Sequence, residues 1–286
     1  MTRAAHATIS RMVPLKKAAV LILVLAPWCA PCTLAAGETI TFQAGGETVR
    51  AYVAQPADPD GRPGIVLVHH LWGLDSHTMS VADRFARLGY VVVAPDLYRG
   101  RLGTDFGLAQ EMMRRLDEGR AVALVQGAIG RLRSMGGAGR RPVALVGFGM
   151  GGRVALATAL QAAADVQALV IFYGHPETTP EGVMPIGAPV LGVFGTDDRA
   201  VPVEEARKFE AALKAAGKQA TIIIYAGMAH AFFDDSRADH EPEMAKDAWV
   251  RTKDFLSEVL GPPQGERPAA VAPASPAGAA AAPPDR

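Results

Sequence analysis

The chain has 286 residues, with 29 basic and 29 acidic side chains and a hydrophobic fraction of 49%. Balanced charge offers no long-range attraction to phosphate backbones or anionic lipids, so composition argues against nucleic-acid binding and against a charge-held membrane role. The hydrophobic fraction is too high for a disordered chain, and the length suffices for one sizeable core.

The first 36 residues have the pattern of a secretory signal peptide. Two lysines precede the apolar run 18–26, which is too short to span a bilayer, and the small residues at 33–36 are typical of a cleavage site. Met12 would be a more usual start for such a signal than Met1. We expect residues 1–36 to be removed and the protein to be secreted or periplasmic, without stable membrane association; an uncleaved N-terminal anchor is the alternative.

The two cysteines, Cys29 and Cys32, both lie in this segment. Their Trp-Cys-x-Pro-Cys pattern resembles the redox motif of thioredoxins, but no predicted strand precedes it and no β-α-β pattern surrounds it. Removal of the segment would leave a chain with no thiol for disulfide, metal or nucleophilic chemistry. It would also leave 25 basic against 29 acidic side chains.

From Gly37 onward the apolar pattern becomes regular. The ranges 39–43 and 49–54 alternate apolar and polar residues around Ala44-Gly45-Gly46-Glu47, which predicts a β-hairpin. Continuous apolar runs, typical of strands buried on both faces, occur at 65–68, 91–94, 143–146, 169–172, 190–194 and 222–225. Helical spacing occurs at 79–88, 108–135, 151–163, 203–216 and 242–260. This order predicts an α/β fold with a mostly parallel, doubly wound sheet and an N-terminal β-hairpin.

The chain after Leu260 is rich in proline and alanine. Such a composition offers too little bulky apolar surface to offset the entropy of ordering the segment. We therefore expect a disordered tail at 261–286 and a single domain at 37–260 that carries the function.

Three loops that follow predicted strands carry the residues most suited to catalysis. The strand at 143–146 leads through Gly147-Phe148-Gly149-Met150-Gly151-Gly152 directly into a helix, which is the pattern of a nucleophile elbow. A glycine-rich turn is the alternative; a dinucleotide fingerprint does not fit, because no acidic residue ends the next strand. Asp198 and His230 follow two later strands, in the chain order elbow, acid, histidine of α/β-hydrolases. In such a triad the acid orients the imidazole, which accepts the nucleophile's proton.

These positions resemble the dienelactone hydrolase family over nearly the whole predicted domain. The matching segments are Val68-His69-His70-Leu71-Trp72-Gly73-Leu74, Ala94-Pro95-Asp96-Leu97-Tyr98, the elbow, Asp198-x-x-Val201-Pro202, and Gly227-x-x-His230-Ala231-Phe232-Phe233. The resemblance implies an α/β-hydrolase fold with no large lid and no cofactor, acting on small esters or lactones. It implies that Asp198 is the triad acid and His230 the base. It also implies an oxyanion hole formed by the N–H groups of Leu71 and Met150, and we expect Trp72 and Tyr98 in the substrate pocket.

Three residues depart from the family pattern. Gly149 stands where the resemblance places the nucleophile, usually cysteine, and His70 stands where it places a glutamate that activates the thiol. Asp234 stands where dienelactone enzymes have an arginine that contacts the substrate carboxylate. Because an acid repels a carboxylate, this last departure argues against a carboxylated lactone as the substrate.

Two functions of different classes follow from the missing nucleophile. In the first, His230 acts as general base on a water that takes the place of the thiol, which predicts weak esterase or lactonase activity. A zinc variant would use His70, His230 and Asp198 as ligands, whereas the adjacent His69 points to the opposite face of a strand. In the second, the protein is a secreted small-molecule-binding pseudo-hydrolase. We favour the first, without a metal. His77 has no partner pattern, so we expect it at the surface.

Overall fold

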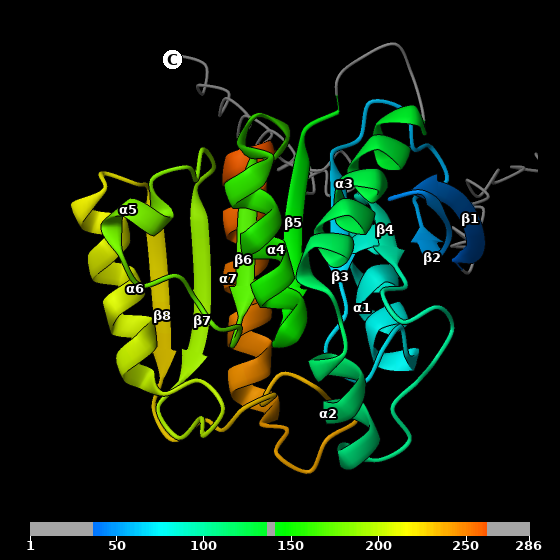
Figure 1. Cartoon of the computed structure of the whole chain (residues 1–286). Coiled ribbons are helices and arrows are strands. Elements are labelled where there is room, and N and C mark those ends of the chain that lie inside the picture. The colour runs from blue at the N-terminus through cyan, green and yellow to red at the C-terminus, as the bar shows by residue number, and fades with distance from the viewer. Residues whose placement is uncertain (1–36, 136–140, 262–286) are drawn as a thin grey trace, which may run out of the picture. The chain divides into compact units, whose positions relative to one another are not determined.

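The computed structural model describes residues 37–135 and 141–261. The predicted signal peptide at 1–36 and nearly all of the predicted tail at 261–286 lie outside the described residues. Within the described ranges, no helix is both long and apolar enough to cross a membrane. Eight strands form one sheet in the order β1-β2-β4-β3-β5-β6-β7-β8 (Figure 1).

The strands and helices alternate along the chain after the first two strands. The strands are β1 (Glu38–Ala44), β2 (Glu47–Ala54), β3 (Gly64–Val68), β4 (Val91–Pro95), β5 (Val143–Phe148), β6 (Ala168–Phe172), β7 (Val190–Gly195) and β8 (Ala220–Tyr225). The α-helices are α1 (Ser76–Arg87), α2 (Phe106–Arg114), α3 (Glu118–Ser134), α4 (Met150–Gln161), α5 (Pro180–Val183), α6 (Val203–Ala215) and α7 (Pro242–Leu260). In the part of the chain that the structure describes, one 3₁₀ turn, η1, spans Ala163–Asp165.

Strands β1 and β2 form the predicted hairpin at one edge of the sheet. Ala44 pairs with Glu47 across the turn, and both Gly45 and Gly46 have positive φ angles, of 56° and 77°. Two successive positive φ angles fit a two-residue hairpin turn whose twist matches that of the strands, and glycine adopts them without strain. Strand β2 then pairs antiparallel with β4, where Ala51 faces Pro95.

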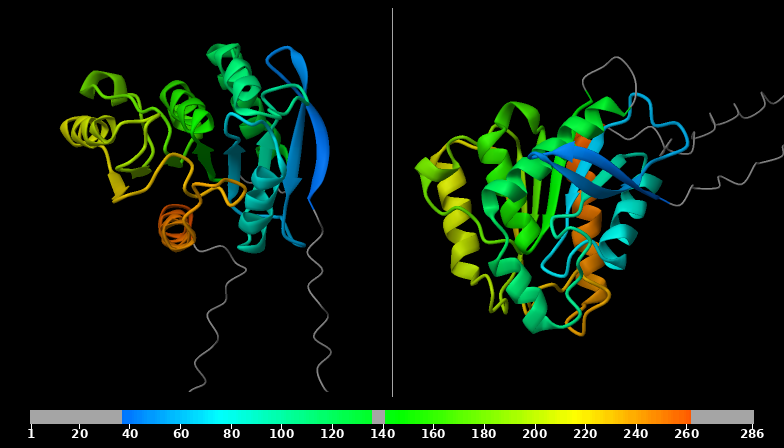
Figure 2. Two further views of the ribbon diagram at one scale, coloured as in Figure 1. Left: turned by 90° about the horizontal axis from the view of Figure 1, so that it is seen from below. Right: turned by 45° about the vertical axis from the view of Figure 1, so that its right-hand side comes forward.

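The remaining strands run parallel, and helices cover both faces of the sheet. Helices α3, α4 and α6 pack in one apolar layer, and α1 and α7 pack in the other (Figure 2). Strands β3 to β7 are buried along their whole length, which explains their continuous apolar sequences. The predicted α/β-hydrolase architecture is confirmed, and all six parallel strands present their carboxyl ends at one edge of the sheet.

One predicted helix, at 108–135, is wrong as a single element. The chain forms α2 and α3 instead, and the break falls where the side chain of Asp117 accepts a hydrogen bond of 2.6 Å from the N–H of Arg120. An aspartate in this position satisfies a free N–H of the first helical turn and starts a new helix. Helix α5 was not predicted, although Thr179 caps it and Pro180 occupies its first position.

Besides the pairing of β2 with β4, Glu47 links the hairpin to the rest of the domain. Its carboxylate accepts hydrogen bonds from Arg120 on α3, at 2.5 Å, and from Arg99, at 2.8 Å. These two guanidinium groups lower the pKa of Glu47 from its ordinary value near 4.5 to about 2. The contribution of these ion pairs to the stability of the fold is therefore fully present above pH 4.5, and it is lost as the pH falls toward 2.

Replacing Glu47 with glutamine is expected to reduce the free energy of unfolding at pH 7 by about 1 kcal/mol, because the pair is only partly screened by solvent. Urea unfolding between pH 2 and pH 7 measures this. The variant should lose less stability than the native protein as the pH falls from 4.5 to 2. Parallel pH curves would contradict the assignment.

Candidate functional site

A cavity of about 1060 Å³ lies at the carboxyl edge of the parallel strands. Six of the predicted site residues line it: His70, Leu71, Trp72, Gly149, Met150 and His230. Asp198 is buried behind His230. Tyr98 is not among the lining residues, contrary to our expectation, because its buried hydroxyl donates to Sδ of Met150 at 3.0 Å. Tyr98 therefore supports the cavity wall from behind.

Asp198 and His230 form a hydrogen-bonded pair that joins the loops after β7 and β8. Nδ1 of His230 lies 2.8 Å from Oδ2 of Asp198. The other oxygen, Oδ1, accepts hydrogen bonds from the backbone N–H groups of Ala200 and Val201, at 2.8 and 2.9 Å. A carboxylate held in this way accepts the Nδ1 hydrogen, so the lone pair of His230 resides on Nε2. The imidazole has the tautomer and the orientation that a general base needs.

Gly149 connects β5 to α4 with φ 53° and ψ −115°, a conformation that L-residues rarely adopt. A Cβ atom at Gly149 would lie 3.3 Å from Nε2 of His230. The neighbouring glycines have a different role, since a Cβ at Gly147 or Gly151 would lie 2.2 or 2.3 Å from a backbone oxygen. Close packing thus requires Gly147 and Gly151, whereas Gly149 occupies an elbow that points at His230.

The two predicted oxyanion donors, Leu71 and Met150, both line the cavity. Leu71 follows β3, and Met150 is the first residue of α4. Within the described residues, neither N–H donates a backbone hydrogen bond outside helices and strands. The first N–H groups of a helix have no intrahelical acceptor, and they favour a developing negative charge.

The adjacent histidines after β3 have separate and fixed partners. Nδ1 of His69 contacts the carbonyl oxygen of His70 at 2.7 Å, and Nε2 of His69 accepts from the N–H of Leu97 at 3.1 Å. Complete burial lowers the pKa of His69 to about 4, so this residue is neutral and structural. His70 instead faces the cavity, and its Nδ1 accepts from the N–H of Trp72 at 3.2 Å.

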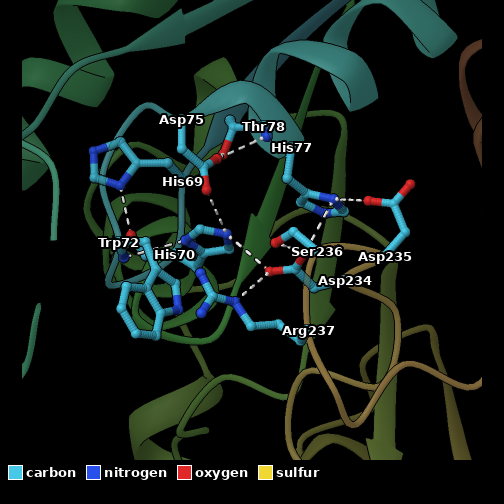
Figure 3. A network of polar contacts seen from close by, with 10 residues as sticks. All are labelled: His69, His70, Trp72, Asp75, His77, Thr78, Asp234, Asp235, Ser236 and Arg237. Carbon is cyan, nitrogen blue, oxygen red and sulfur yellow. Dashed lines mark hydrogen bonds and ion pairs between the residues drawn. The ribbon is translucent and has the colours of Figure 1, made fainter. Parts of the chain in front are cut away.

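A buried carboxylate, Asp234, joins two histidines of different segments (Figure 3). Its Oδ2 lies 3.2 Å from Nε2 of His70, and its Oδ1 lies 3.2 Å from Nδ1 of His77. Ser236 donates to Oδ1 through both its N–H and its hydroxyl, at 3.0 and 2.6 Å. Burial alone would raise the pKa of Asp234, but the contacts with His70 and Ser236 and the charge of His77 hold it well below its ordinary range. The carboxylate is therefore charged and acts as the centre of the network.

The prediction that His77 lies at the surface is wrong. His77 is in the first turn of α1, is buried, and has Nδ1 2.8 Å from the exposed Oδ1 of Asp235. Its partners lie far along the chain, in the loop after His230, so no local pattern could have revealed them. The helix start itself was recognisable, since Asp75 caps α1 by accepting from the N–H of Thr78 at 3.0 Å.

The zinc set considered from sequence is not brought together. Asp198 binds Nδ1 of His230 directly, whereas His70 contacts Asp234. Among residues 37–135 and 141–261, the group with metal-ligand spacing is His77, Asp234 and Asp235, whose donor atoms lie within 4.8 Å of one another. Hydrogen bonds and ion pairs within the network already engage the side chains of these three residues.

Arg237 and Tyr173 are among the cavity residues that were not predicted. The guanidinium of Arg237 stacks on the ring of Trp72, 3.7 Å from its centroid, and its Nε lies 3.5 Å from Oδ2 of Asp234. The buried ring of Tyr173 lies 5.0 Å from that of His230, and its backbone has φ 40°, which is unusual for a residue with a side chain. Tyr173 follows β6, the strand that pairs with β5, so its ring packs beside the imidazole of His230.

Comparison with known proteins places this arrangement in a family. The sequence profile of the dienelactone hydrolase family matches residues 49–260, which is most of the described chain. The chain belongs to the dienelactone hydrolase family. A relative from Methylorubrum extorquens, provisionally named a carboxymethylenebutenolidase, is 31% identical over 242 residues, which cover 79% of this chain and 81% of the relative. A Yersinia pestis protein with the same provisional name is 31% identical, covering 78% of this chain and 88% of its own length.

The solved structures agree with this membership. A Klebsiella pneumoniae protein, provisionally named a dienelactone hydrolase, is 27% identical with a TM-score of 0.70, covering 78% of this chain and 98% of that one. Within this dienelactone hydrolase framework, His70 and Asp234, two positions at which we expect departures from the family pattern, are in direct contact.

Proposed function

We propose that this member of the dienelactone hydrolase family hydrolyses small esters or lactones through a water molecule that His230 activates. One observation carries the proposal: the His230 and Asp198 pair faces an elbow residue, Gly149, that has no side chain. The Cβ position at Gly149 lies 3.3 Å from Nε2 of His230, so the base faces at short range an elbow position that carries no side chain. The proposed water takes the place of the nucleophilic side chain there.

The proposed reaction has two steps. In the first, Nε2 of His230 takes a proton from water while the water oxygen bonds to the ester carbonyl carbon, and Asp198 stabilises the imidazolium. The N–H groups of Leu71 and Met150 donate to the oxyanion that forms. In the second, the oxyanion collapses, the carbon–oxygen bond to the leaving group breaks, and His230 returns the proton to the departing oxygen. The products are a carboxylic acid and an alcohol, and no covalent acyl-enzyme forms.

A kinetic experiment tests this route directly. Rapid mixing with p-nitrophenyl acetate should give steady p-nitrophenol release without an initial burst, and mass spectrometry should detect no acetylated protein. A burst that equals the enzyme concentration would overturn the water route, because it would require a covalent intermediate. Absence of any hydrolysis above that of a His230→Ala variant would overturn the enzymatic proposal.

Replacing Gly149 with cysteine is expected to raise the rate of p-nitrophenyl acetate hydrolysis by about tenfold or more, because a thiol would be placed against the imidazole and open the covalent route. The variant should show a burst and an acetylated protein. The positive φ angle makes the substitution strained, at a cost of about 1–3 kcal/mol, so thermal unfolding should be measured in parallel.

Gly149→Ala is the matched control for this substitution. It introduces the same strain and a Cβ atom but no nucleophile, so it should reduce activity below that of the native protein by displacing the water beside His230. A cysteine variant that behaves like the alanine variant would contradict the elbow assignment.

A further inference from the structure

We propose that helix α2 forms an apolar subsite that binds a long, uncharged acyl or alkyl chain of the substrate. This inference rests on the proposed function, because the subsite and His230 belong to the same cavity. The proposed substrates are esters with an extended apolar chain that does not end in a carboxylate.

Helix α2 presents two faces. Phe106, Gln110 and Met113 line the cavity, and their spacing of four and three residues places them on one side of the helix. Ala109 and Met112 are buried and hold the helix to the domain from an adjacent side. The residues of α2 that line the cavity are therefore different from those that anchor the helix to the domain.

The cavity side of α2 exposes apolar surface without burying it in the core. Phe106 is 59% exposed and Met113 is 36% exposed. The ring of Trp72 lies 6.3 Å from that of Phe106, and Trp72, Leu116 and Met150 continue the apolar lining toward the elbow at Gly149. An apolar chain laid from the elbow to Phe106 would remove this surface from water, which is favourable in proportion to the area buried.

The charges in the cavity wall do not favour a carboxylate. Three arginines and four acidic residues line the cavity, so they supply no net positive charge. Arg153 is held by Glu118 at 2.6 Å, and Arg237 is held between Asp234 and the Trp72 ring. Arg199 is the third arginine, but the acidic residues of the wall outnumber the arginines. A negatively charged chain end therefore gains no net electrostatic attraction and loses its hydration on entering.

Three substrates with the same leaving group test the subsite: p-nitrophenyl acetate, p-nitrophenyl octanoate and the mono-p-nitrophenyl ester of suberic acid, whose chain ends in a carboxylate. We expect kcat/KM to be about tenfold higher for the octanoate than for the other two. The double variant Phe106→Ala with Met113→Ala should lose about tenfold on the octanoate and less than about twofold on the acetate.

The double variant Met184→Ala with Val250→Ala is the matched control, because these exposed apolar residues do not line the cavity. It should retain the native preference for the octanoate. Equal losses on acetate and octanoate in the α2 variant would overturn the subsite, as would a preference for the charged chain.

A binding measurement separates this inference from the proposed function. The melting temperature of the native protein should rise more with 2-octanone than with 2-butanone, and the α2 double variant should lose that difference. Ketones are not hydrolysed, so this result stands even if no ester is turned over. Equal shifts with both ketones would overturn the subsite while leaving the hydrolase proposal intact.

Discussion

Replacing His230 with alanine is expected to lower kcat for p-nitrophenyl acetate by about 10²–10⁴-fold, the range that a positioned general base contributes. The reason is geometric: Nδ1 is engaged by Asp198 at 2.8 Å, and Nε2 faces the elbow that carries no side chain. The effect should fall on kcat more than on KM, because the imidazole acts on water and not on the bound ester. Steady-state kinetics over a range of ester concentrations measures both quantities.

His175→Ala provides a matched control. This histidine also lines the cavity and also contacts an acid, with Nδ1 3.1 Å from Glu205, but its side chain is half exposed. It lies outside the elbow, so its removal should change kcat by less than about threefold. Equal losses in the two variants would mean that His230 has no role that another histidine of the cavity does not share, and would contradict the assignment of His230 as the base.

Much of the fold was predictable because the buried strands have a distinctive composition. The parallel strands at 65–68, 143–146 and 169–172 are apolar on both faces, since helices cover both sides of the sheet. The break between α2 and α3 was missed because the apolar spacing continues through it, whereas the local capping hydrogen bond of Asp117 decides the boundary. The spacing of apolar residues indicates which face of a helix is buried, whereas capping residues indicate where a helix begins.

Some residues of the candidate site were predictable from the sequence and others were not. The positions of Asp198 and His230 follow from the rule that functional residues collect at the carboxyl ends of parallel strands, and the structure brings these two residues together. The pairing of His70 and His77 with Asp234 could not be predicted, because it joins segments far apart in sequence through side-chain geometry alone. The apolar spacing at 108–135 likewise did not reveal that Met113 faces a cavity instead of the core, and Phe106 lies outside that predicted range.

Replacing Asp234 with asparagine is expected to reduce the free energy of unfolding by about 3–5 kcal/mol, the cost of removing one partner from a buried charged network. The carboxylate is fully buried and contacts His70, His77 and Arg237, and its replacement by an amide would leave the guanidinium of Arg237 without this counter-charge. Urea denaturation at pH 7 measures the loss. Asp235→Asn is the matched control: its side chain is 63% exposed, so loss of its contact with His77 should cost less than about 1 kcal/mol.

The same substitution should also reduce activity, because Asp234 anchors the side chain of His70, whose Nδ1 accepts from the N–H of Trp72 beside the proposed oxyanion donor Leu71. The pKa of Asp234 is held below its ordinary value, so its contribution to stability is present above about pH 4 and is lost as the pH falls further. An asparagine side chain cannot titrate, and the stability of the Asp234→Asn variant should therefore vary less than that of the native protein below about pH 4. If this variant were as stable as Asp235→Asn and kept full activity, the network would be a passive feature of the loop, and the contact between His70 and Asp234 would have no functional meaning.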